Sequence, residues 1–145
     1  MTLRLGTAVA QQIFETLRAA YPEEGCGVML GRDLGPVREI VSIAALDNDS
    51  PENRDRRYII SPGQFLAAER EARSRDLDVV GIFHSHPDHP PEPSAFDLEH
   101  AWPYYSYLIV SVGPDGAREV RAWRLLEDRT RFEPEPLDLA PAEIS

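Results

Sequence analysis

The segment HSHPDHPPEPSAFD, residues 84–97, holds the side chains of this chain that are best suited to chemistry. His84 and His86 are separated by one residue, and Asp97 follows a proline-rich stretch. Two neutral imidazoles and one carboxylate form a ligand set for zinc, with water in the fourth position, and such an open set is typical of catalytic zinc. With a single cysteine in the chain, cysteine ligands are not available to close the site. The spacing therefore predicts a catalytic metal site.

The same residues also fit an ordinary polar loop. His-x-His pairs occur by chance, and Ser94 with Asp97 matches the Ser-x-x-acid pattern of a helix capping box. His89, inside the proline run, and His100, in the segment after it, are expected to face solvent rather than to bind a metal. Residue spacing by itself leaves the metal site and the polar loop as alternatives.

A hydrolytic metal site also needs a carboxylate that accepts a proton from water and passes it to the leaving amine. Glu23 and Glu24 stand just before the apolar run CGVML at 26–30 and are the candidates for this task. A glutamate in a loop is equally well explained as a solvated side chain. Spacing alone does not choose between the two glutamates, nor between function and solvation.

Hydrophobic periodicity, interrupted by glycines and prolines, indicates alternating helices and strands. Helices are expected at residues 8–20, with Thr7 as the cap, from a capping box at Ser61 to about residue 75, and at 94–102. Strands are expected at 26–30, 36–46, 57–60, 77–86, 106–112 and 117–126, the last two joined by a turn at 113–116. This alternation predicts one α/β or α+β domain built on a mixed sheet. The domain would span residues 1–133, and a loose, proline-rich acidic tail would follow at 134–145.

The expected strand that carries both histidines is apolar on both faces over residues 79–83, so we expect it at the centre of the sheet. Because side chains alternate along a strand, His84 and His86 should lie on one face, with Ser85 on the other. Both histidines stand at the carboxyl end of the strand, where α/β sheets place their sites. The stiff proline-rich connection can then carry Asp97 back over the two imidazoles.

Charge and composition narrow the function classes. The formal net charge of −10 repels phosphate backbones, and the sequence has no basic stripe to counter it, which argues against nucleic-acid binding. An acidic surface suits a basic or neutral protein partner, and it suits a salt-rich cytoplasm equally well. Cys26 has no second cysteine to pair with, so a reducing cytoplasm is expected. No run approaches about 20 apolar residues, and the N-terminal segment lacks a secretory pattern, so no membrane association is expected.

Taken together, the motifs resemble those of the JAMM (MPN+) metalloprotease family. That family carries a glutamate shortly before a strand, then His-x-His-Pro, then Ser-x-x-Asp after a short linker. This chain has Glu24 ahead of Cys26-Gly27, then His84-Ser85-His86-Pro87, then Ser94-Ala95-Phe96-Asp97. The family glutamate stands two residues before a small residue and a glycine, which selects Glu24 over Glu23. The resemblance covers roughly residues 8–126.

The resemblance implies roles at the matching positions. His84, His86 and Asp97 would bind Zn2+. Glu24 would activate water and then protonate the leaving amine, and Ser94 would help to hold the oxyanion. The implied enzyme is a zinc metallopeptidase with a curved mixed sheet flanked by helices, a fold similar to that of cytidine deaminase. The deaminase activity itself is not implied, because its His-x-Glu and Pro-Cys-x-x-Cys motifs are missing.

The resemblance also suggests a substrate class. The chain is similar to the compact prokaryotic members of the family, some of which trim a residue or a protein from the C-terminus of a small ubiquitin-like sulfur carrier that ends in Gly-Gly. The implied reaction is hydrolysis of a peptide or isopeptide bond after such a tail, with the carrier as the partner. Two alternatives are a zinc hydrolase of small peptides or amides, and a non-catalytic MPN module that binds proteins. The sequence indicates no particular oligomeric state.

Overall fold

The structure is a computed structural model that describes residues 1–139. Its helices are α1 (Thr7–Ala20), α2 (Pro62–Ser74) and α3 (Ala95–His100). Its strands are β1 (Thr2–Leu5), β2 (Cys26–Asp33), β3 (Val37–Leu46), β4 (Asp78–Pro87), β5 (Ser106–Gly113), β6 (Gly116–Leu125), β7 (Phe132–Glu135) and β8 (Leu137–Asp138). Among the described residues, no helix has the length and apolar character needed to cross a membrane.

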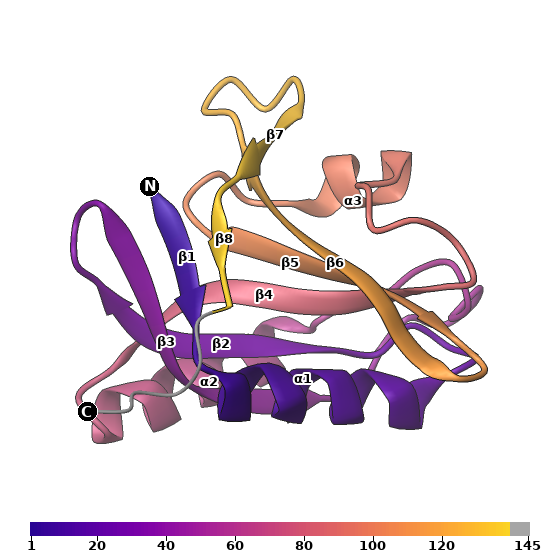
Figure 1. The fold of residues 1–145 in the computed structure, drawn as a ribbon, viewed down its shortest axis with the longest axis horizontal. Helices are drawn as coiled ribbons and strands as arrows, with labels where there is room; N and C mark the ends of the chain where they lie inside the picture. The colour runs from indigo at the N-terminus through magenta and orange to yellow at the C-terminus, as the bar shows by residue number, and fades with distance from the viewer. Residues whose placement is uncertain (140–145) are drawn as a thin grey trace.

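The strands form one mixed sheet in the order β7-β6-β5-β4-β2-β3-β1-β8. β4 lies near the middle, antiparallel to β2 and parallel to β5. β7 and β8 stand at opposite edges in this order, yet only Pro136 separates them along the chain. The two edges must therefore meet, and the sheet curls round on itself (Figure 1). This confirms the curved mixed sheet flanked by helices.

Two apolar clusters lie on either side of the sheet. On one face, α1 buries Ile13 and Leu17 in a cluster that includes Phe83 of β4. On the other face, α2 buries Ala68 and Ala72 in a cluster that includes Ile82, the neighbour of Phe83. β4 is thus covered on both sides, as its apolar sequence predicts for a central strand.

The helices form where their sequence signals stand, with one correction at a cap. The capping boxes of α2 and α3 are both formed, at Ser61 and Ser94. The predicted cap at Thr7 is wrong, because Thr7 is already the first residue of α1 and Gly6 takes the N-cap position without a side-chain bond.

The strand predicted at 57–60 is also wrong. The backbone of Ile59 is bonded within its own loop: Asp49 donates its N–H to the Ile59 carbonyl (2.9 Å), and Ile59 donates to Oδ1 of Asn48 (3.2 Å). The β-branched residues suggested a strand at 57–60. In the structure, hydrogen bonds to Asn48 and Asp49 take the place of pairing with another strand.

Part of the segment expected to be a loose tail belongs to the sheet. β7 pairs with β6, and β8 pairs with β1. The Glu135 side chain is buried, with Oε2 3.6 Å from Nη1 of Arg124, and Leu3 donates its N–H to the Pro136 carbonyl (2.9 Å). Long-range partners at both edges therefore order these residues, while the rest of the predicted tail, residues 140–145, lies outside the described part of the chain.

Candidate metal centre

β4 presents His84 and His86 on the sheet face that α2 covers. Both histidines follow Ile82 at intervals of two residues, and Ile82 packs in the same cluster as α2. His84 pairs with Cys26 of β2 on one side and with Ile109 of β5 on the other. Both imidazoles are buried, with exposed fractions of 1% and 0%.

Asp97, in the first turn of α3, lies against both histidines. Its Oδ2 is 3.0 Å from Nε2 of His86, and its Oδ1 is 3.9 Å from Nε2 of His84. Each of the three residues offers a ligand atom within 4.8 Å of the others, and all three are buried. The two imidazole planes are inclined by 55°, which lets both Nε2 atoms face the same carboxylate.

The start of α3 fixes the Asp97 carboxylate. Asp97 donates its N–H to Oγ of Ser94 (3.1 Å), and Ser94 donates its N–H to Oδ2 of Asp97 (2.9 Å). This reciprocal capping box orders the first turn of a helix that has only six residues. One structural device thus begins the helix and aims the carboxylate at the imidazoles.

The proline-rich loop fixes the orientation of His86. Its Nδ1 donates a hydrogen bond to the carbonyl of Pro90 (2.8 Å), so the hydrogen of the neutral ring lies on Nδ1. The Nε2 lone pair then faces Oδ2 of Asp97 at 3.0 Å. At this distance the two atoms are satisfied either by a second proton on the ring, at Nε2, or by a cation bound beside both of them.

Glu24 approaches the same cluster from the segment before β2. Its side chain is buried, whereas Glu23 is exposed. Oε1 of Glu24 lies 3.4 Å from Nδ1 of His84, and within the described part of the chain both buried atoms are without a hydrogen-bond partner. Glu24 is therefore the glutamate that reaches the site, with an oxygen left available there.

The charges of the cluster shift one another's pKa values. Burial lowers the pKa of His84, but the Asp97 and Glu24 carboxylates outweigh it and hold that pKa above its ordinary value of 6.5. Burial raises the pKa of Asp97, but His84, His86 and the N–H of Ser94 hold it well below its ordinary value of 3.8. The raised pKa of His84 favours its protonated form, and the lowered pKa of Asp97 keeps that carboxylate ionised, so the cluster favours an added cation.

These observations fit a divalent metal. Two inclined imidazoles and a carboxylate converge, and a hydrogen bond to the Pro90 carbonyl places a proton on Nδ1 of His86. Within residues 1–139, two buried polar atoms of this cluster, Oε1 of Glu24 and Nδ1 of His84, lack a hydrogen-bond partner. Imidazole nitrogen with carboxylate oxygen is a donor set that zinc accepts. His84, His86 and Asp97 are the residues that would hold it.

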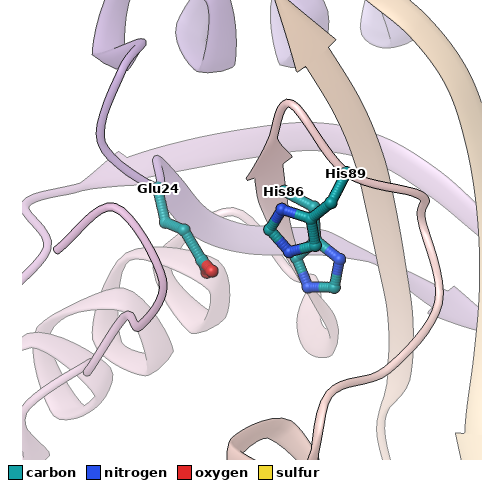
Figure 2. Close-up of side chains that lie close together, drawn as sticks. All are labelled: Glu24, His86 and His89. Atoms are coloured by element: carbon teal, nitrogen blue, oxygen red, sulfur yellow. The ribbon is translucent and has the colours of Figure 1, made fainter. Parts of the chain in front are cut away.

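A second group, Glu24 with His86 and His89, also places three ligand atoms within 4.8 Å of one another. Figure 2 shows the Glu24 carboxylate directed toward the rings of His86 and His89. These two rings are stacked, with centroids 4.2 Å apart and planes only 17° from parallel. An imidazole binds an ion in its ring plane at about 2.0–2.1 Å, so parallel stacked rings do not converge on one ion. We call His84, His86 and Asp97 the metal group. His89 is therefore a neighbour of the metal group rather than one of its ligands.

His89 departs from its expected solvent-facing position. Its ring is half-buried on His86, and its Nδ1 donates to the carbonyl of Pro87 (2.8 Å). His100 is exposed, as expected. The sequence placed His89 in the proline run, but its contact with His86 depends on how that run folds.

Tyr58, from the loop before α2, is a residue beside the cluster that sequence patterns did not single out. Its ring stacks on His84, with centroids 4.3 Å apart and planes 23° from parallel. Beyond Tyr58 opens a largely apolar pocket of about 730 Å³. Its walls include Tyr58, Ile60, Phe65, Ile82, Trp102 and Tyr105. The pocket thus adjoins the metal group, and Trp102 is 62% exposed beside it.

Cys26 packs beside the site without the properties of a nucleophile. Burial, with the Glu24 and Asp47 carboxylates, raises the pKa of its thiol to about 12. Sγ lies 3.7 Å from the Leu46 carbonyl, a weak contact. A protonated, buried thiol of this kind is inert, so Cys26 is a core residue.

Two curated relatives align with most of the chain. One is a protein named desampylase from Haloferax volcanii, 37% identical over 103 residues, which cover 70% of each chain. The other is a protein from Thermus thermophilus named probable TtuB-protein conjugate cleaving protease, 33% identical over 97 residues, covering 67% of this chain and 60% of that protein.

Solved structures share the fold over nearly the whole chain. A protein from Desulfitobacterium hafniense superposes with a TM-score of 0.84 and 28% identity, covering 96% of this chain and 93% of that one. A JAB1/MPN domain protein from Archaeoglobus fulgidus gives a TM-score of 0.59 at 18% identity, with coverage of 97% and 99%, and supports the fold alone.

The family model described as prokaryotic homologs of the JAB domain matches residues 6–126. That span contains Glu24, both histidines of β4, Ser94 and Asp97, and therefore the whole cluster. The chain is a hydrolase that belongs to the prokaryotic JAB-domain family, the compact branch of the JAMM/MPN proteins.

Proposed function

We propose that the protein is a zinc-dependent metallopeptidase that hydrolyses the peptide or isopeptide bond after the C-terminal Gly-Gly of a ubiquitin-like sulfur carrier. The observation that carries this proposal is the convergence of His84, His86 and Asp97 beside the buried carboxylate of Glu24. Zinc held by the first three residues would supply a Lewis acid that polarises the scissile carbonyl and lowers the pKa of water.

Glu24 would carry the proton. Its Oε1 is buried and lacks a hydrogen-bond partner in the described part of the chain, so it is available to accept a proton from the attacking water. The same oxygen would then deliver the proton to the departing amine, which must be protonated to leave. The low exposure of Glu24, 2%, keeps bulk water from competing for that proton.

Ser94 would stabilise the carbonyl oxygen as it gains negative charge. Its Oγ accepts the N–H of Asp97, and this bond leaves the hydroxyl hydrogen available for donation. The capping box holds Ser94 beside Asp97, so the donor stands next to the metal group before the substrate arrives.

The proposed substrate class is supported by the relatives and by the shape of the site. One relative is named desampylase, and the other is named a probable TtuB-protein conjugate cleaving protease, a name that refers to cleavage of a protein conjugate. The apolar pocket beyond Tyr58 would take an apolar side chain of the substrate, while glycines would pass the crowded point where Tyr58 covers His84. A cytoplasmic location is proposed with this function, because the single cysteine forms no internal disulfide.

The decisive experiment uses a small ubiquitin-like carrier that bears a C-terminal extension after Gly-Gly. Incubation with the protein, read by mass spectrometry, should release a carrier that ends in Gly-Gly. A chelator should stop the release, and added zinc should restore it. The matched control is the same carrier with the last glycine replaced by a bulky residue, which should remain uncut.

Two results would overturn the proposal in different ways. Cleavage of short peptides with no cleavage of the folded carrier would identify a peptide or amide hydrolase instead. Release that persists undiminished in Glu24→Gln would show that Glu24 does not carry the proton.

A further inference from the structure

The loop at residues 47–61, between β3 and α2, contacts both the proposed proton carrier and a proposed metal ligand. The Arg54 carbonyl accepts the backbone N–H of Glu24 (2.7 Å). Tyr58 stacks on His84, and the Arg57 guanidinium lies 4.7 Å from the ring centroid of Phe96 in α3. This loop is therefore attached to three sides of the site at once.

Asn48 is the hub of the loop. Its Nδ2 donates to the carbonyl of Glu24 (3.0 Å) and to the carbonyl of Arg57 (2.8 Å). Its Oδ1 accepts the N–H groups of Ser50 (3.0 Å) and Ile59 (3.2 Å). The amide thus uses two donated and two accepted bonds, which is its full ordinary capacity. A side chain satisfied in this way has one orientation and fixes its partners.

The position of the Glu24 carboxylate depends on its backbone. Among residues 1–139, Oε1 has no hydrogen-bond partner to hold it, although it lies 3.4 Å from Nδ1 of His84. The backbone, by contrast, is held at three adjacent points: the Glu24 N–H by Arg54, the Glu24 carbonyl by Asn48, and the Gly25 N–H by Oγ of Ser85 (2.8 Å). Main-chain anchors therefore decide where the acidic side chain points.

We infer that Asn48 is a positioning residue: it holds Glu24 in register with the metal group and joins it to the loop that carries Tyr58. The inference rests on the proposed role of Glu24. Asn48 does not touch the reacting atoms and acts through Glu24. A shift of about 1 Å in a catalytic group can cost about 100-fold in rate, so loss of this anchor should be visible in kcat.

Asn48→Asp is the sharpest test. The substitution keeps the shape and the acceptor for Ser50 and Ile59, but it removes both donated bonds and sets a carboxylate against the carbonyls of Glu24 and Arg57. We expect kcat to fall about 10–100-fold with KM changed far less. Zinc affinity, read by competition with a chromophoric chelator, should stay unchanged, because no metal ligand is altered.

A matched control lies in the same loop. Asp55 is exposed, and Asp55→Asn makes the reverse chemical change there; its kcat, KM and zinc affinity should equal those of the parent protein. A fall in kcat of equal size in this control would show that the loop is sensitive to any change, which overturns the assignment to Asn48.

A double-mutant cycle separates positioning from general damage. In single-turnover measurements, adding Asn48→Asp to Glu24→Gln should cost little beyond Glu24→Gln alone, because both changes act through one group. An equal fold-loss in both backgrounds would overturn the inference. Unchanged kcat in Asn48→Asp would do the same, whereas full activity of Glu24→Gln alone would overturn the proposed function instead.

Stability is followed by thermal unfolding of the same proteins. If Asn48→Asp does not fold, Asn48→Ala removes the bonds without adding charge and supplies the kinetic measurement. Failure of both variants to fold would assign Asn48 to stability rather than to the placement of Glu24, and the inference would be wrong.

Discussion

The imidazole of His89 lies flat against that of His86, with ring centroids 4.2 Å apart and planes 17° from parallel. Nδ1 of His89 donates to the Pro87 carbonyl, and Nδ1 of His86 donates to the Pro90 carbonyl, both at 2.8 Å. The proline-rich loop therefore fixes a proposed metal ligand through a hydrogen bond and through a stacked neighbour.

Replacing His89 by Ala should weaken zinc binding by about 10-fold, within the range seen for residues that orient metal ligands. His89→Phe keeps a flat ring on His86 and should bind zinc nearly as the parent protein does. Competition with a chelator measures both affinities. Equal weakening in the two variants would show that the ring nitrogens, rather than the stacking, matter.

Glu24→Gln should separate the metal from the proton. The amide cannot carry a proton, so the rate should fall by about 10²–10⁴-fold, while zinc content stays the same. His84→Ala and Asp97→Ala should lose both activity and zinc, because a two-ligand site binds weakly. Metal analysis of each purified protein, beside its rate, checks the pattern; zinc loss in Glu24→Gln would place that residue among the ligands.

Ser94→Ala distinguishes an oxyanion donor from a helix cap. Loss of a donor should lower kcat by about 10²–10³-fold. Loss of the cap should cost about 1 kcal/mol of stability. Measuring kcat together with the free energy of unfolding reads both effects, and a stability loss with unchanged kcat would leave Ser94 with the cap alone.

Zinc uptake should weaken in mild acid. Binding needs the neutral imidazole of His84, and the Asp97 and Glu24 carboxylates, which outweigh burial, hold its pKa above the ordinary 6.5. Protons should therefore begin to compete at a higher pH than for a free imidazole. Calorimetric titration from about pH 8 down to pH 5 should show affinity falling and proton release rising; affinity independent of pH over this range would contradict the assignment of His84.

The same pKa shifts decide how the stability of the chelated protein changes with pH. Since the pKa of His84 is raised, its contribution to stability is present below the ordinary value of 6.5 and is lost as the pH rises through the shifted value. Since the pKa of Asp97 is lowered, its contribution is present above the ordinary value of 3.8 and is lost only in stronger acid. The cluster should therefore stabilise the chelated protein most between the ordinary pKa values of 3.8 and 6.5, and thermal unfolding over this pH range checks it.

Local sequence signals account for the elements that hold the site. Two capping boxes, Ser-x-x-Gln at Ser61 and Ser-x-x-Asp at Ser94, satisfy helix N–H groups within four residues. Both caps can therefore be predicted from the local sequence alone. The two-residue spacing of His84 and His86 also predicts their position, because side chains alternate along a strand and both therefore lie on one face of β4.

What the sequence did not reveal depends on distant partners. The strand predicted at 57–60 failed because Asn48 and Asp49 bond the backbone of Ile59. β1 and β8 are short and exist through pairing across the sheet, which leaves no local pattern. The contact of Tyr58 with His84 needs the loop path and the strand together, so neither residue alone predicts it.

The position of Pro136, between the two edge strands β7 and β8, has a consequence for biosynthesis. Arg4 and Asp138 form an ion pair at 3.1 Å across a separation of 134 residues. A growing chain on the ribosome can complete neither border of its sheet until the codons for these last strands have been translated. Until then, both borders present unsatisfied backbone groups, the feature that makes nascent β proteins dependent on fast closure or on chaperones.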